Sequence, residues 1–171
     1  MAKGENWPSG SFGAKPKSCG NFLFLPGLAR LPASADKVEI GLPSMRVTIE
    51  KDFRFEAAQQ LPGFPEGHKC RQLHGHSFEV RVAVEGEVDP ATGILYDHAR
   101  ISRAVEPLLA ELDHRFLNEI PGLENPTIES MARWFWERLV SLLPGLAQIT
   151  ICETSRVRCL YRGPTPSSAR S

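Results

Sequence analysis

Apolar and polar residues alternate along four segments of the chain, and a period of two predicts strands. The alternation is clearest over 46–59 and 73–87, and shorter segments at 147–154 and 157–162 repeat it. Gln59 and Glu153 fall on the apolar side of their segments. Because a charge facing a core needs a partner, Glu153 is predicted to meet either a polar ligand or a buried arginine.

Two segments between these pairs of strands repeat their apolar residues at helical spacing. The first follows Asp97, a suitable N-cap, and runs to Leu112, and Pro107 is expected to kink or divide it. The second opens at Thr127 and ends before Pro144. The order predicts an α+β fold, in which a four-stranded antiparallel sheet (β-β-α-α-β-β) carries two helices on one face.

The length and the charge of the chain limit the number of domains and the kinds of partner that it is expected to have. A chain of 171 residues is long enough for one domain with a proper core. Its 20 basic and 20 acidic side chains balance, which disfavours nucleic acid and membrane surfaces as partners. No apolar run approaches the roughly 20 residues that span a bilayer. The four cysteines are sparse and unevenly spaced, which favours free thiols and a cytoplasmic location.

The two ends of the chain differ from its middle. Residues 1–44 are rich in Gly, Pro, Ser and Lys and are predicted to form a disordered extension. Part of this segment loosely copies a signal peptide, but Pro26 and Arg30 interrupt its apolar portion, so secretion is disfavoured. We expect an ordered domain over 45–163 and a loose tail over 164–171.

The most informative motif is Cys70-x-x-x-His74-Gly75-His76, at the start of the second predicted strand. Side chains at i and i+2 of a strand share a face, so the two imidazoles converge as Zn²⁺ requires. Cys70 is either a further ligand or a nearby acid–base group. The first possibility predicts a structural zinc site, and the second predicts an enzyme.

The motif and its surroundings resemble the 6-pyruvoyl-tetrahydropterin synthase superfamily, and most of all its branch of 6-carboxy-5,6,7,8-tetrahydropterin synthases of queuosine biosynthesis. The resemblance spans about 45–163. The matching pieces, in the expected order, are Phe-Glu-Ala-Ala at 55–58, Pro-Glu-Gly-His-Lys-Cys at 65–70, Leu-His-Gly-His-Ser-Phe at 73–78, Leu-Asp-His at 112–114, Leu-Asn at 117–118, Gly-Leu-Glu-Asn-Pro-Thr at 122–127 and Cys-Leu-Tyr-Arg-Gly at 159–163.

The resemblance implies a tunnelling fold, in which subunits join their sheets into a barrel as a homo-oligomer, a trimer or a dimer of trimers, with sites between subunits. It also implies a lyase reaction: a pterin triphosphate, 7,8-dihydroneopterin triphosphate, would give 6-carboxytetrahydropterin, acetaldehyde and triphosphate. Zinc would act as a Lewis acid on the oxygens of the substrate side chain. Neither a nicotinamide nor a flavin is expected.

The resemblance also implies roles for individual residues. Cys70 would accept a proton as a thiolate, favoured by its basic neighbours and the cation. His114, oriented by Asp113, would return protons. Glu153 would bind the N–H edge of the pterin ring in bidentate fashion. His74 and His76 would hold the zinc.

One position departs from the family pattern. A histidine that directly follows Phe-x-Ala-Ala is the family's third zinc ligand, and Gln59 stands there. A neutral amide oxygen should bind zinc more weakly than imidazole. Gln59 could coordinate, water could replace it, or His68 could move in. We expect a retained but weaker site anchored by the two other histidines.

Three other functions stay open at this stage, and one of them is a degenerate member of the family that binds pterin but turns over poorly because of Gln59. A 6-pyruvoyl-tetrahydropterin synthase would use the same substrate and retain its three-carbon side chain. A non-catalytic protein would instead close a structural zinc site with Cys70, His74 and His76, and its cysteine sulfur would lie about 2.3 Å from the ion.

Overall fold

The computed structural model describes residues 44–165. The predicted extension, 1–44, and the predicted tail, 164–171, therefore lie outside the described residues except for positions 44, 164 and 165. The strands form one sheet in the order β3-β1-β2-β4-β5. Their bounds are Arg46–Gln59 for β1, His74–Glu87 for β2, Arg115–Phe116 for β3, Leu146–Thr154 for β4 and Val157–Tyr161 for β5.

The α+β prediction is confirmed, but the sheet is mixed rather than purely antiparallel. The extra strand, β3, pairs in parallel with β1 through Arg115 opposite Ala57 and Phe116 opposite Ala58. It follows His114, which has a φ of 57° and turns the chain. A strand of two residues is too short to show an alternating pattern, which is why the sequence did not predict it.

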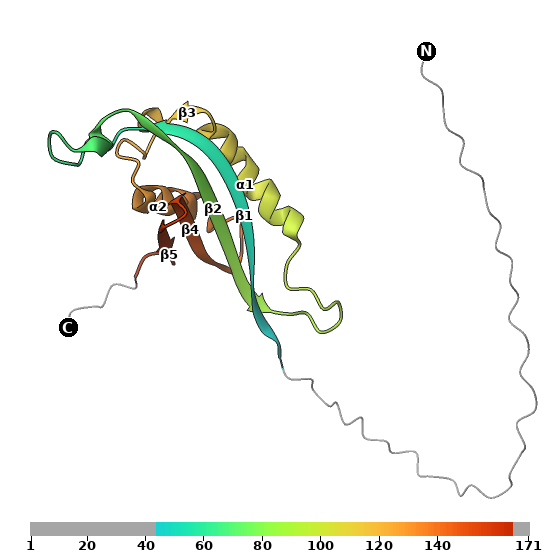
Figure 1. Cartoon of the computed structure of the whole chain (residues 1–171). Coiled ribbons are helices and arrows are strands. Elements are labelled where there is room, and N and C mark those ends of the chain that lie inside the picture. The colour runs from blue at the N-terminus through green and yellow to red at the C-terminus, as the bar shows by residue number, and fades with distance from the viewer. Residues whose placement is uncertain (1–43, 166–171) are drawn as a thin grey trace, which may run out of the picture. The chain divides into compact units, whose positions relative to one another are not determined.

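Two helices cover one face of the sheet. Helix α1, His98–Leu112, is capped by Asp97, whose carboxylate accepts the N–H of Ala99. Helix α2, Ile128–Leu139, is capped by the side chain of Thr127. Figure 1 shows α1 beside β1 and α2 beside β4 and β5.

Pro107 does not divide the first helix, which is one of the two outcomes expected for it. Proline removes a helical hydrogen bond, yet α1 continues through it as a single helix. Ile101 and Val105 before Pro107 and Leu112 after it are all fully buried. Burial of this apolar face on both sides of Pro107 outweighs the lost bond.

The core lies between the helices and the sheet face that the alternating pattern predicted. Phe78 of β2 stacks on Phe55 of β1, with ring centroids 5.0 Å apart. Among the other fully buried residues are Val80, Val82, Ile101, Leu112, Met131, Phe135, Leu139, Ile149 and Ile151. The same face of β1 and β2 continues toward Gln59 and His74, so the core leads directly to the residues of the motif.

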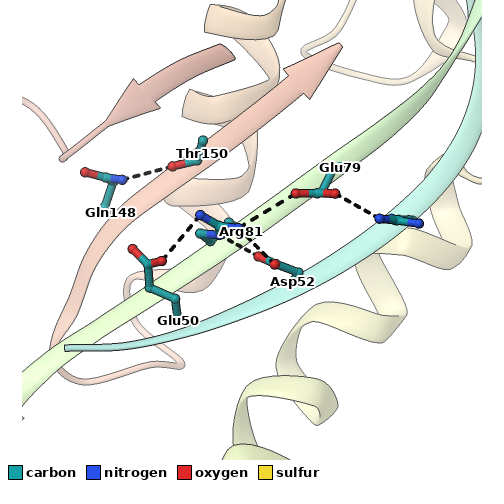
Figure 2. A network of polar contacts seen from close by, with 7 residues as sticks. Glu50, Asp52, Glu79, Arg81, Gln148 and Thr150 are labelled. Atoms are coloured by element: carbon teal, nitrogen blue, oxygen red, sulfur yellow. Dashed lines mark hydrogen bonds and ion pairs between the residues drawn. The ribbon is translucent and has the colours of Figure 1, made fainter. Parts of the chain in front are cut away.

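The opposite face of the sheet is polar, as Figure 2 shows for its central strands. Arg81 of β2 donates to Asp52 of β1 and lies 3.5 Å from Glu50 and 3.9 Å from Glu79. The hydrogen bond from Arg81 holds the pKa of the Asp52 carboxyl below its usual value. Within residues 44–165, no helix has the length and apolar character that crossing a membrane requires.

Candidate active site

The two histidines of the motif begin β2, where the backbone of β1 lies close. Gly75 pairs with Ala58, and a side-chain carbon at position 75 would lie 3.2 Å from the carbonyl oxygen of Ala57. Such a contact is tight, so glycine lets the strands approach here. His74 and His76 point to the same face, and their ring centroids are 5.0 Å apart.

The ring of His74 is oriented by the backbone. Its Nδ1 lies 2.7 Å from the carbonyl oxygen of Gln72. Because a carbonyl only accepts, Nδ1 carries the proton and Nε2 of the neutral ring keeps its lone pair. A backbone partner of this kind is typical of histidines that bind metal ions.

Glu153 of β4 completes a cluster with the two histidines. Its Oε1 lies 3.2 Å from Nε2 of His76 and accepts a hydrogen bond from Nε2 of Gln59 at 2.9 Å. The inward direction of Glu153 agrees with the prediction from its strand. Of the two partners considered for it, the buried arginine is wrong, because its neighbours are an imidazole and an amide.

The donor atoms fit a divalent cation. One ligand atom from each of His74, His76 and Glu153 lies within 4.8 Å of the others. Gln59 is fully buried, and its Oε1 has no hydrogen-bond partner. A buried polar atom without a partner costs about 1–3 kcal/mol, so a bound group that satisfies this oxygen would stabilise the site.

Cys70 lies in a short 3-10 turn, η1, Lys69–Arg71. The Sγ of Cys70 does not belong to the cluster of metal-type donors among residues 44–165. The backbone around it is fixed, because its carbonyl accepts the N–H of Leu61 and its own N–H donates to Nδ1 of His68. Cys70 therefore lies outside the donor cluster, and it does not line either of the two clefts described below.

His68 and Arg71 have roles that the sequence did not reveal. The His68 ring caps the η1 turn and stacks on Phe64 with centroids 4.1 Å apart. Arg71 donates to the carbonyl oxygens of Pro62 and Phe64. His68 therefore does not move into the donor cluster, and Arg71 fastens the loop in front of Cys70. A proline-rich loop has no period from which these contacts could be predicted.

Asp113 and His114 meet β1 at the same end of the sheet. Asp113 Oδ2 lies 2.9 Å from Nδ1 of His114, and its Oδ1 accepts the N–H of Glu56. The backbone N–H of Glu56, and after it the hydrogen bond to His114, lower the pKa of the Asp113 carboxyl. The carboxylate orients the ring, as a proton relay would require, and that ring is 77% exposed.

We expect Asp113→Asn to destabilise the protein at pH 7 more than at pH 3. The lowered pKa means that the carboxylate contributes stability above its unfolded value of about 3.9. That contribution is lost as the pH falls through the lower pKa of the folded protein. The difference in free energy of unfolding between the unmodified protein and the uncharged variant therefore becomes smaller. Urea unfolding at both pH values measures this difference. A difference of equal size at both, with Glu66→Gln on the exposed loop as control, would contradict the assignment.

Two clefts meet at His76, and His74 lines neither of them. One, of about 520 Å³, is lined by His76, His114, Arg115 and parts of β1. The other, of about 700 Å³, is lined by His76, Glu153, Arg158 and the polar face of β2. His76 and the adjacent Ser77 belong to both. A ligand in the smaller cleft can therefore touch His76 and His114 together.

Known proteins are similar to this chain in sequence and in fold. A family model described as 6-pyruvoyl tetrahydropterin synthase matches residues 48–164. The 6-carboxy-5,6,7,8-tetrahydropterin synthase of Synechocystis is 41% identical over 122 residues, which cover 68% of this chain and 93% of the relative. The dihydroneopterin monophosphate aldolase of Pyrococcus furiosus is 43% identical over 74 residues, 43% of this chain and 61% of that protein.

A solved structure agrees with these relatives. The 6-pyruvoyl tetrahydropterin synthase of Caenorhabditis elegans superposes with a TM-score of 0.65 and 29% identity, over 70% of this chain and 97% of that one. The resemblance found in the sequence is thereby confirmed, and so is the tunnelling fold. The strand order, the paired histidines of β2 and the match over 48–164 together establish that the chain belongs to the 6-pyruvoyl tetrahydropterin synthase family.

Proposed function

We propose that the protein is a zinc-dependent carbon–carbon lyase that converts 7,8-dihydroneopterin triphosphate to 6-carboxy-5,6,7,8-tetrahydropterin, acetaldehyde and triphosphate. The observation that carries this proposal is the meeting of His74, His76 and Glu153, together with the cleft that His76 shares with His114. The 41% identical Synechocystis relative bears the name of this activity and is covered over 93% of its length.

Each residue of the site has a task in this reaction. His74 and His76 would hold the zinc, which when bound polarises the oxygens of the substrate side chain. Cys70 would take a proton from the side-chain carbon. His114, with its ring held by Asp113, would carry protons back to the product. Glu153 would accept hydrogen bonds from the pterin ring.

The reaction balances without a redox cofactor. The bond between the first and second side-chain carbons breaks, and the second and third carbons leave as acetaldehyde with loss of triphosphate. The first carbon is oxidised to a carboxylate whose second oxygen comes from water. The side chain as a whole loses two electrons in these steps. The dihydropterin ring takes up these two electrons and becomes a tetrahydropterin.

We further propose a homo-oligomer, a trimer or a dimer of trimers, with sites at subunit interfaces. The edge strand β5 exposes the apolar side chains of Val157 and Leu160, which favours pairing of this edge with another copy. The product would serve queuosine or 7-deazaguanine biosynthesis in the cytoplasm. The free thiols of Cys70, Cys152 and Cys159 suit a reducing compartment.

The decisive experiment is incubation of the protein with dihydroneopterin triphosphate, with and without a chelator, followed by mass analysis of the products. We expect 6-carboxytetrahydropterin and acetaldehyde in equal amounts, and neither product after zinc is removed. A product that keeps three side-chain carbons would instead assign the 6-pyruvoyl activity. Equal turnover with and without chelator would contradict the dependence on zinc.

A further inference from the structure

Gln59 and Glu153 are the two candidates for the third protein ligand of the cation, beside His74 and His76. Both side chains come to His74 and His76 on the core-facing side of the sheet, from β1 and from β4. Gln59 stands where the family pattern has its third zinc ligand, and in the structure it pairs directly with His74. The side-chain contacts favour Glu153 instead.

The distances support Glu153 as a ligand. Atoms bound to one zinc ion at about 2.0–2.2 Å lie roughly 3 to 4 Å from one another. Glu153 Oε1 lies 3.2 Å from His76 Nε2, and one donor atom of each residue falls within 4.8 Å of the other two. Small side-chain movements would bring all three into the first coordination sphere.

Charge supports the same choice. Two neutral imidazoles leave the charge of a divalent ion uncompensated in a site that is about three-quarters buried, since the side chains of His76 and Glu153 are 23% and 24% exposed. A carboxylate offsets part of that charge, and a neutral amide does not. Two histidines and one glutamate also form a known donor set of catalytic zinc sites that keep one position open.

Gln59 then acts on the carboxylate through its Nε2, and its Oε1, which has no hydrogen-bond partner, is left for a water molecule rather than for the ion. Its Nε2 donates to Glu153 Oε1 at 2.9 Å, and its side chain is fully buried. A buried amide that donates to a ligating carboxylate fixes the direction of that ligand. We propose that Glu153 is the third protein ligand of the divalent cation, together with His74 and His76, and that Gln59 is the residue that positions it.

This inference rests on the proposed function, since it concerns the ligands of the cation which that reaction requires. It also refines the role of Glu153. With Oε1 on the cation, only Oε2 would be left for the pterin ring. Binding of the ring is then monodentate, not the bidentate contact that the family resemblance implies.

Metal binding tests the inference independently of turnover. Metal-free protein is titrated with Zn²⁺ against a chromophoric chelator, and with Co²⁺ to record the visible absorption of the ligand field. The variants are Glu153→Gln, which keeps the shape and removes the charge, and Gln59→Leu, which removes the donor. Glu79→Gln, a carboxylate that lines the larger cleft outside the cluster, is the matched control.

We expect Glu153→Gln to weaken Zn²⁺ binding by at least about 100-fold and to change the Co²⁺ spectrum. Gln59→Leu should weaken binding by about 10-fold, as loss of a partner that orients a ligand does, and should keep the spectral shape. Glu79→Gln should change neither. Unchanged affinity in Glu153→Gln, or a larger loss in Gln59→Leu than in Glu153→Gln, would overturn the assignment.

The two proposals fail in different ways. If these affinities follow expectation while dihydroneopterin triphosphate is not converted, the ligand set stands and the proposed reaction is wrong. If the substrate is converted and Glu153→Gln binds zinc as tightly as the unmodified protein, the reaction stands and Glu153 is not a ligand. Circular dichroism of each variant confirms that the fold is retained.

Discussion

Replacing Cys70 with alanine is expected to lower the turnover of dihydroneopterin triphosphate by about 10²- to 10⁴-fold, the usual contribution of a positioned acid–base group. The backbone of the turn should survive, because its hydrogen bonds to Leu61 and His68 use main-chain atoms of residue 70. Zinc affinity should stay within about twofold, since the thiol lies outside the donor cluster of residues 44–165. Steady-state kinetics and chelator competition measure both quantities.

The control for this variant is Cys159→Ala. Burial raises the pKa of the Cys159 thiol, so that sulfur stays neutral and should be dispensable for turnover. If Cys70→Ala instead released zinc and unfolded the protein, the cysteine would be a metal ligand, and the structural zinc site considered from the sequence would be correct. Full activity in Cys70→Ala would remove the thiol from the mechanism.

Phe78→Ala is expected to cost about 3–5 kcal/mol in the free energy of unfolding, the range for deletion of a buried aromatic ring. Phe78 is fully buried and stacks on Phe55. Its other neighbour is His76, with ring centroids 5.6 Å apart. The cavity should therefore also loosen this histidine, and zinc affinity should fall together with stability.

Denaturant unfolding at one fixed protein concentration measures the effect, because association of subunits would also contribute to stability. Phe64→Ala is the matched control, since Phe64 is 38% exposed on the loop before β2. The free energy of unfolding of Phe64→Ala should fall by about 1 kcal/mol or less. A cost below about 1 kcal/mol for Phe78→Ala would mean that the core packs differently around β2.

The long elements could be predicted because each has an apolar side that meets one surface. Strand β1 has the bounds that its alternation predicts, and α1 begins after the expected cap at Asp97. Helix α2 ends at Leu139, before the predicted stop at Pro144. Leu143 is nevertheless buried while Leu142 is exposed. An apolar run reveals burial, but it does not reveal where helical geometry ends.

Only those features of the candidate site that are set within a single strand could be predicted from the sequence. The convergence of His74 and His76 follows from their spacing, and the inward direction of Glu153 follows from its neighbours. The contact between Gln59 and Glu153 joins β1 and β4 across β2. It depends on the register of β1 against β2 and on the register of β2 against β4, and no local sequence pattern determines either of them. The cap of His68 on Cys70 was hidden for the same reason, since it belongs to an irregular loop.

The close approach of the backbones at Gly75 has a wider consequence. His74 and His76 are two residues apart on one strand, and pairing with β1 holds that strand in place at Gly75, so their geometry is set by the main chain rather than by the surrounding loops. Substitutions, insertions or deletions in the segment between Leu61 and Lys69 can therefore accumulate without moving the imidazoles. Adding a single methyl group at position 75 would disturb them more than rewriting most of that loop.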